Sequence, residues 1–171
     1  MEKKKKDYSL HVFLRYSEHM APESGTIKSH EDLIMNHGAV WFGKFGKRIG
    51  VPMTDVLEKQ IKEKKPVYLF LAIKKDGNYK VHAGVVEKIS QSTKEVDSKL
   101  VPTYYKQKKW MVKTWFKILK FIPLDPEILR ILNGKTSKLP LIESIRSSMS
   151  PSIYATLDNK VNLEKFVKKS I

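Results

Sequence analysis

The residues best suited to chemistry are aromatic side chains set among cations. Residues 37–50 read HGAVWFGKFGKRIG and place Trp41 directly before Phe42. An exposed indole stacks on a nucleobase for roughly 1–3 kcal/mol, and neighbouring cations neutralise phosphate. The pattern favours a stacking platform beside a cationic loop, with a buried tryptophan at a sheet corner as the alternative. The cations of this loop are Lys44, Lys47 and Arg48.

A second stretch repeats this mixture of rings and cations. Residues 104–117 read YYKQKKWMVKTWFK and contain Trp110 and Trp115. In a strand beginning at residue 110, Trp115 shares a face with Lys113 and Lys117. That face is too charged for a core, so we expect it to be exposed. Tryptophans that cover the ends of a barrel are the alternative. The lysines available to phosphate are Lys106, Lys108, Lys109, Lys113 and Lys117.

The composition favours a polyanionic partner. The 171 residues include 33 Lys and Arg against 18 Asp and Glu, a formal charge of +15. Such an excess is typical of nucleic-acid binding, with an acidic membrane surface second. A heat-adapted, lysine-rich chain is another explanation, but there glutamate rises with lysine. No apolar run approaches the roughly 20 residues of a membrane span, and the charged start lacks a signal peptide's apolar segment. We expect a cytoplasmic protein without membrane contact.

Catalysis has little support in the sequence. The chain has no cysteine, which excludes disulfides, thiol nucleophiles and thiolate zinc sites. GxSxG, P-loop and HExxH motifs are missing, and the carboxylates do not cluster as a metal-dependent nuclease requires. His30 and His37 are expected to be solvated or to cap a helix. We predict a binding domain with no catalytic residue, no metal and no cofactor.

The hydrophobic pattern predicts a mixture of helices and strands around one sheet. The clearest signal is a β-hairpin over residues 66–89, whose first strand is fully apolar and therefore central in its sheet. The polar connection at residues 90–109 is long enough to indicate a functional or mobile segment. The other expected strands are 8–17, 39–42 and 110–123, the expected helices are 30–38, 54–65, 127–134 and 158–171, and the stretch 137–157 is expected to be irregular or partly helical.

An ordered set of segments resembles the YTH and EVE group of the PUA-like superfamily. The segments are VFLRYS, GAVWFGKFGKR, VYLFLAIKKDGNYKVHAGVVEKI and KKWMVKTWFKILKFIP. The resemblance spans residues 8–125 and implies an α+β, PUA-like curled sheet or barrel of about five to six strands flanked by helices. Residues 1–7 are then a basic arm, and residues 126–171 a helical extension packed on the same domain.

The resemblance also implies a binding site. Members of this group hold a methylated base, typically N6-methyladenine, flipped into an aromatic cage. Trp41 matches the first cage tryptophan, and Ser17 matches a polar residue beside the pocket. Trp110 is the nearest match to the second cage tryptophan, with Trp115 as the fallback. Phe42 stands where the group usually has Ser or Cys, so base contacts at that point differ.

A partner follows from the same resemblance. A lysine-rich reader is similar to the recognition domain of McrB-type restriction systems, which finds modified DNA for a separate AAA+ motor and nuclease. The sequence has no Walker A motif, so a motor would lie beyond residue 171 or on another chain. We expect recognition of N6-methyladenine in DNA by base flipping. An RNA reader of methylated adenosine and sequence-independent binding through the basic surface are the alternatives.

Overall fold

The computed structural model describes residues 7–19, 21–106, 108–147, 150 and 152–168. All of the expected basic arm except Asp7 lies outside the described residues. The strands are β1 (Tyr8–Arg15), β2 (Val40–Phe45), β3 (Tyr68–Lys75), β4 (Asn78–Ser90), β5 (Val112–Leu124), β6 (Asn133–Gly134) and β7 (Ser152–Asp158). The α-helices are α1 (Thr26–His37), α2 (Val51–Lys62), α3 (Ile128–Ile131) and α4 (Leu141–Ser147). The short 3-10 turns are η1 (Thr93–Glu95), η2 (Ser98–Leu100), η3 (Thr103–Tyr105), η4 (Lys109–Met111) and η5 (Leu163–Phe166).

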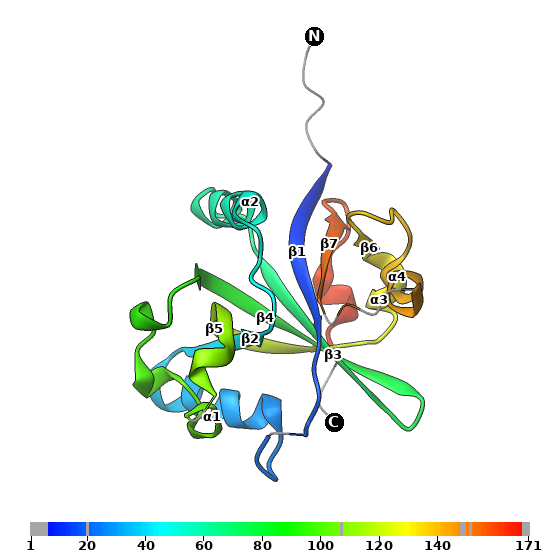
Figure 1. Cartoon of the computed structure of the whole chain (residues 1–171). Coiled ribbons are helices and arrows are strands. Elements are labelled where there is room, and N and C mark those ends of the chain that lie inside the picture. The colour runs from blue at the N-terminus through cyan, green and yellow to red at the C-terminus, as the bar shows by residue number, and fades with distance from the viewer. Residues whose placement is uncertain (1–6, 20, 107, 148–149, 151, 169–171) are drawn as a thin grey trace.

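The described strands form one mixed sheet in the order β2-β5-β4-β3-β1-β7-β6. Among these pairings β1 with β3 is parallel and the others are antiparallel. The expected α+β class is confirmed. The sheet has seven strands instead of five to six, and it stays open because β2 and β6 are edges. Figure 1 shows α2 on one side of β1, and α3 and α4 on the other.

The β3–β4 hairpin forms where the sequence places it. Lys75 pairs with Asn78, which leaves Asp76 and Gly77 as a two-residue turn. Both turn residues have positive φ, 51° and 80°, as the right-handed twist of a tight hairpin requires. β3 lies between β4 and β1, so its apolar run is central as expected.

Side chains distant in sequence fix two of the helices. α1 begins at Thr26, four residues earlier than expected, where the Glu18 carboxylate accepts from the Thr26 amide at 2.8 Å. α2 buries Leu57 and sends the Gln60 amide to the backbone of β1. Gln60 accepts from Leu10 N at 3.0 Å and donates to Leu10 O at 3.1 Å. The Gln60 side chain therefore acts as a short additional strand beside β1.

The C-terminal part of the chain is less helical than expected. Residues 152–158 form β7, which pairs with β1 from Tyr8↔Asp158 to Leu14↔Ser152. The helix expected over residues 127–134 is reduced to α3, and the described residues after 158 contain the turn η5 and an isolated bridge from Val167 to Leu124 in place of the expected helix. The expectation of irregular or helical structure at 152–157 was wrong because pairing with β1, far away in sequence, creates this strand.

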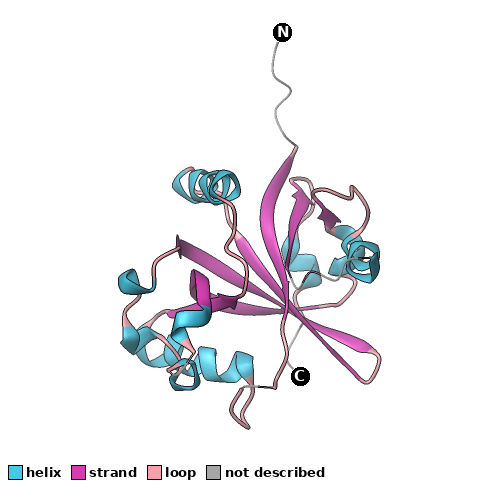
Figure 2. Cartoon of the chain, in the orientation of Figure 1, coloured by secondary structure: helices cyan, strands magenta, loops and turns pink. Residues whose placement is uncertain are grey.

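The long connection after β4 folds back on the sheet. It forms the turns η1 to η4, which gather beside α1 and β2 (Figure 2). Val101 and Tyr105 from this connection pack against Trp41 and Trp115 of the strands. The connection therefore covers one corner of the sheet instead of extending into solvent.

Candidate functional site

Two cavities lie along a seam between β1 and β2, which do not pair with each other. Leu14 and Phe42 line the first, which we call the aromatic cavity and which holds ≈ 220 Å³. Val12 and Lys44 line the second, which we call the loop cavity and which holds ≈ 580 Å³. Phe45 lines both cavities. The end of β1 and the end of β2 therefore position two adjacent hollows.

Aromatic rings form much of the wall of the aromatic cavity. Tyr105 stacks on Phe45 with ring centroids 5.6 Å apart and planes inclined by 9°, and on Tyr104 at 4.7 Å and 26°. Ligand sites for drug-sized molecules hold roughly 300–1,000 Å³, so this smaller hollow suits one flat group such as a nucleobase. The lining residues are Leu14, Arg15, Tyr16, Ser17, Ala21, Thr26, Phe42, Gly43, Phe45, Tyr104 and Tyr105.

Buried hydrogen bonds hold Tyr105 in place. Its hydroxyl accepts from the amide of Gly43 at 3.3 Å and lies 3.3 Å from Nε2 of His30. Nδ1 of His30 lies 2.7 Å from the carbonyl oxygen of Thr26. A carbonyl only accepts, so Nδ1 carries the proton and Nε2 accepts from Tyr105. Burial raises the pKa of Tyr105 well above its ordinary value, so this wall is a neutral phenol.

His30 is the buried support of this wall, which corrects the expectation of a solvated or capping histidine. Its exposed fraction is 0%, and its ring lies 4.8 Å from that of Phe42 and 5.7 Å from that of Tyr105. Burial lowers the pKa of His30 to about 4, against a smaller upward contribution from its bond to Thr26. The imidazole is therefore neutral at pH 7.

The structure separates the three tryptophans. Trp41 is 4% exposed and Trp115 is 0% exposed, so the expectation of an open Trp115 was wrong. The Trp115 indole donates to Oγ1 of Thr93 at 3.1 Å. Trp110, on η4, is 73% exposed. Alternation along β5 fails as a guide here because the connection after β4 covers the face that the sequence assigned to solvent.

The other expected cage residues do lie together. Ser17, which follows Tyr16, and Phe42 both line the aromatic cavity. Sequence reasoning passed over Phe45, Tyr104 and Tyr105, which supply the stacked rings. Their signal was present in the adjacent tyrosines of YYKQKKW, which stand six and five residues before Trp110, the one exposed indole of the described residues.

The cations of the first loop line the loop cavity. Lys47 and Arg48 are exposed, but Lys44 is only 4% exposed and its ammonium donates to the carbonyl oxygen of Lys47. Burial lowers the pKa of Lys44. No described carboxylate lies within ion-pair distance of these three cations, and none lines the cavity.

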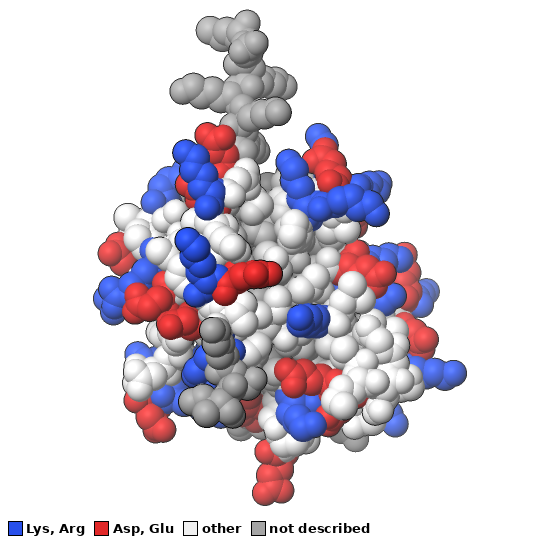
Figure 3. All heavy atoms as spheres, turned by 180° about the vertical axis from the view of Figure 1, so that it is seen from behind, with Lys and Arg blue, Asp and Glu red and all other residues white. Residues whose placement is uncertain are grey.

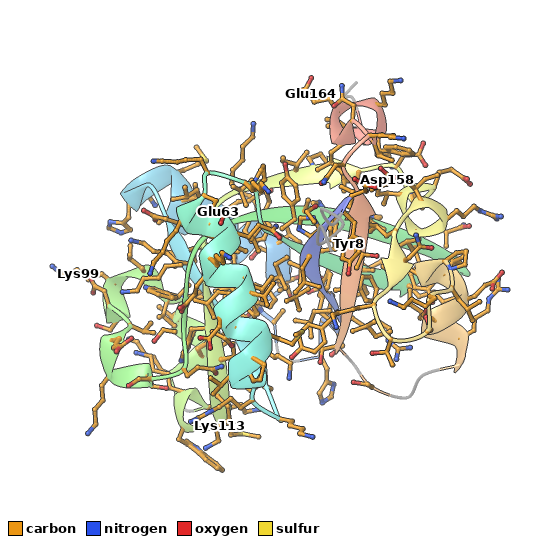
Figure 4. All side chains as sticks on the ribbon, turned by 90° about the horizontal axis from the view of Figure 1, so that it is seen from above. Tyr8, Glu63, Lys99, Lys113, Asp158 and Glu164 are labelled. Carbon is orange, nitrogen blue, oxygen red and sulfur yellow. The ribbon has the colours of Figure 1, made fainter. Side chains whose placement is uncertain are left out.

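The second group of lysines is divided between a cavity and the surface. Lys106 and Lys109 line a third hollow of ≈ 480 Å³ between α1 and the 3-10 turns, which we call the turn cavity. Lys113 is exposed and points outward at the rim (Figure 4). Lys117 is half-buried and pairs with Glu87 at 3.4 Å, so its charge is partly neutralised. Lys108 is half-buried and lies between Lys106 and Lys109 in the sequence.

In the described residues no group of three or more acidic or histidine side chains could hold a metal ion, and none of the described helices is both long and apolar enough to cross a membrane.

Comparison with known proteins assigns the family. The searches of curated proteins and of solved structures found no match. The family model described as Pua-like matches residues 12–164. PUA-like domains typically bind nucleic acids and are generally binding modules. Because the match covers most of the chain, this protein belongs to the PUA-like family.

Proposed function

We propose that this protein binds nucleic acid and holds one modified base, first of all N6-methyladenine, in the aromatic cavity. The observation that carries the proposal is a ring-walled hollow of ≈ 220 Å³ beside an unpaired cation cluster in a chain of charge +15. In this proposal Phe45, Tyr104 and Tyr105 form the walls that were expected from Trp41 and from Trp110 or its fallback Trp115. DNA is the preferred ligand in this proposal, and the protein serves as the targeting domain of a modification-dependent restriction system.

The size of the methyl preference follows from burial. Methylation of the exocyclic amine adds an apolar group and leaves one N–H donor. A buried methyl contributes about 0.8 kcal/mol, which corresponds to roughly a fourfold preference over the plain base. Extruding a base from a duplex costs a few kcal/mol. A methylated base in a single strand should therefore bind more tightly than the same base in a duplex.

Trp110 supplies a further surface for a base. It is 73% exposed and follows Tyr105 by five residues, linked through the bonds from Lys108 N to Tyr105 O and from Met111 N to Lys108 O. Stacking of one base on an exposed aromatic ring contributes roughly 1–3 kcal/mol. Loss of this indole should weaken binding of methylated and plain strands alike.

Fluorescence anisotropy with short oligonucleotides tests the proposal. Single-stranded DNA, duplex DNA and single-stranded RNA would each carry one N6-methyladenine, one 5-methylcytosine or no mark. We expect the wild type to prefer N6-methyladenine, and Tyr104→Ala to remove that preference. Trp110→Ala should weaken all ligands by roughly 5- to 150-fold. Met35→Ala, which removes an 83% exposed apolar side chain from α1, is the control.

Sequence-independent binding is the second candidate function. The burial of Trp41 and Trp115 favours it, because two of the three indoles are withdrawn from any ligand in this conformation. Equal affinity for methylated and plain strands in every nucleic acid, with a steep salt dependence, would replace the modified-base proposal by this one.

A further inference from the structure

Three hollows border the aromatic cavity, and each shares a wall residue with it. The loop cavity shares Phe45, and the turn cavity shares Tyr104. A third hollow of ≈ 560 Å³, which we call the mixed-charge cavity, shares Tyr16 and Ala21. These three surfaces are therefore candidate paths for a polymer whose base enters the aromatic cavity.

The three hollows differ in charge. The loop cavity has three cations and no carboxylate in its lining. The turn cavity has Lys99, Lys106 and Lys109 against Asp32, and Asp32 is already paired with Lys28. The mixed-charge cavity has three lysines against three glutamates, and the pKa of its His82 is lowered by burial and by nearby lysines. The cations of the first two hollows are thus available to phosphate, whereas those of the third are balanced.

The partly buried ammonium of Lys44 strengthens the case for the loop cavity. A charge withdrawn from water without a counterion is costly, and an incoming anion offsets that cost. Lys44 is 4% exposed with one hydrogen bond to a carbonyl oxygen and no described ion-pair partner. Gly50 at the start of α2 also lines this hollow, and the first turn of α2 has no acidic residue and no side-chain cap. The helix dipole therefore adds to the same positive potential.

The overall charge alone would not have located this path. Seen from behind, lysine, arginine and acidic side chains are interspersed around a largely uncharged centre (Figure 3). Lys99 and Lys113 lie on the side of the molecule away from Asp158 and Glu164 (Figure 4). The cations that matter are those that line hollows bordering the aromatic cavity.

We propose that a single nucleic-acid strand runs from the loop cavity, over the aromatic cavity, to the turn cavity, and avoids the mixed-charge cavity. The proposal rests on the proposed function, because it takes the base in the aromatic cavity as its fixed point. Phosphates on one side contact Lys44, Lys47 and Arg48, and phosphates on the other contact Lys106 and Lys109. The smallest ligand that uses the whole path has three nucleotides, with the held base in the middle.

Three double variants with the same change of charge test this path. Lys47→Ala with Arg48→Ala removes two cations from the loop cavity, and Lys106→Ala with Lys109→Ala removes two from the turn cavity. Lys75→Ala with Lys80→Ala removes two from the mixed-charge cavity and is the control. Each pair consists of exposed or half-buried side chains, so the fold should tolerate all three changes.

The measurement is the salt dependence of Kd for single-stranded DNA of nine nucleotides, with and without a central N6-methyladenine. Each phosphate contact contributes about 0.7 to the slope of log K against log salt. Both path variants should lower the slope by about 1.4 and leave the ratio of methylated to plain affinity unchanged, and the control should keep the wild-type slope. Affinity should rise from mononucleotide to trinucleotide, and more slowly after that.

Two results would overturn the path. One is an equal loss of slope in the control and the path variants, which would mean that total charge matters and position does not. The other is an unchanged slope in either path variant. These outcomes are separate from the test of the proposed function. If both path variants lower the salt slope but the wild type has no preference for the methylated strand, the modified-base proposal fails and the path stands. If the wild type prefers the methylated strand but neither path variant changes the slope, the path fails and the modified-base proposal stands.

Discussion

Acid should destabilise this protein through His30. Its pKa is lower in the folded chain than in the unfolded chain, so protonation favours the unfolded chain. Burial lowers the pKa of His30 from 6.5 to about 4. Between these values the unfolded state binds a proton that the folded state does not, so stability rises with pH across this window. The contribution of His30 is complete above pH 6.5 and is lost as the pH falls towards 4.

The expected loss is about 3 kcal/mol. A pKa difference of about 2.5 at about 1.4 kcal/mol per pH unit gives about 3.5 kcal/mol in full, and about 0.4 kcal/mol of this is still present at pH 4, where His30 of the folded state is half-protonated. Burial also lowers the pKa of His11, to about 3, so the wild type should lose more than this amount by pH 4. Domains of this size are stable by about 5–15 kcal/mol. These losses are a large fraction of that stability, so the wild type should unfold at a higher pH than a variant without His30.

Protonation of His30 should also change the hydrogen bonds behind the aromatic cavity. Nε2 of His30 accepts from the hydroxyl of Tyr105 in the neutral state. A proton on Nε2 makes that atom a donor, so the Tyr105 hydroxyl must accept from it and turn its own proton elsewhere, while it also accepts from Gly43 N at 3.3 Å. Base binding should weaken over the same pH window in which stability falls.

Urea unfolding between pH 7.5 and 4 measures this effect, with fluorescence of the buried Trp41 and Trp115 as the signal. His30→Gln should flatten the pH dependence of the unfolding free energy by about 3 kcal/mol relative to wild type. His37→Gln removes an exposed histidine from the same helix and is the control. Parallel pH curves for wild type and His30→Gln would refute the reasoning. If the variant does not fold, NMR titration of the wild-type ring decides: an imidazole that titrates near pH 6.5 refutes it too.

Two further substitutions test how the site is held. Gly43→Ala should lower the free energy of unfolding by about 1–3 kcal/mol. The reason is that the new Cβ would lie 3.0 Å from both methyls of Val112 and 3.1 Å from the Trp115 ring. An unfolding free energy in urea within about 0.5 kcal/mol of the wild type would contradict this packing. Gln60→Leu should lower the free energy of unfolding by at least about 2 kcal/mol. It leaves N and O of Leu10 without their side-chain partner, and each buried unpaired group costs about 1–3 kcal/mol. Unchanged amide hydrogen exchange at Leu10 would show that these bonds do not contribute to stability.

Local patterns predicted the elements that local residues determine. The Asp76-Gly77 turn adopts the positive φ that its residue types favour, and α2 forms within three residues of the range expected for it. β7 escaped prediction because its seven residues lie in a segment rich in Ser and Pro, and they become a strand through pairing with β1. No property of residues 152–158 alone encodes that partner.

The same limit explains the tryptophans. Alternation along a strand assigns each side chain to a face, but it does not say what covers that face. The connection after β4 covers Trp115 with Thr93 and Tyr105, and a sequence that reads as a polar linker gives no sign of this. Ser17, two residues after β1, and Phe42, within β2, by contrast line the aromatic cavity, because the pattern located both of these strands.

Trp41 and Trp115 nevertheless pack behind the wall of the aromatic cavity. Trp115 lies 5.7 Å from the Tyr105 ring, and both indoles share a buried cluster with Tyr105. Tyr105 is in turn bonded to Gly43 and His30 and stacked on Phe45. A wall fixed from behind by packing and from its edge by hydrogen bonds loses little freedom when a flat ligand arrives, which favours binding. The buried indoles therefore contribute rigidity to the cavity, while in the proposed function the tyrosines and the exposed Trp110 offer the surfaces that a base contacts.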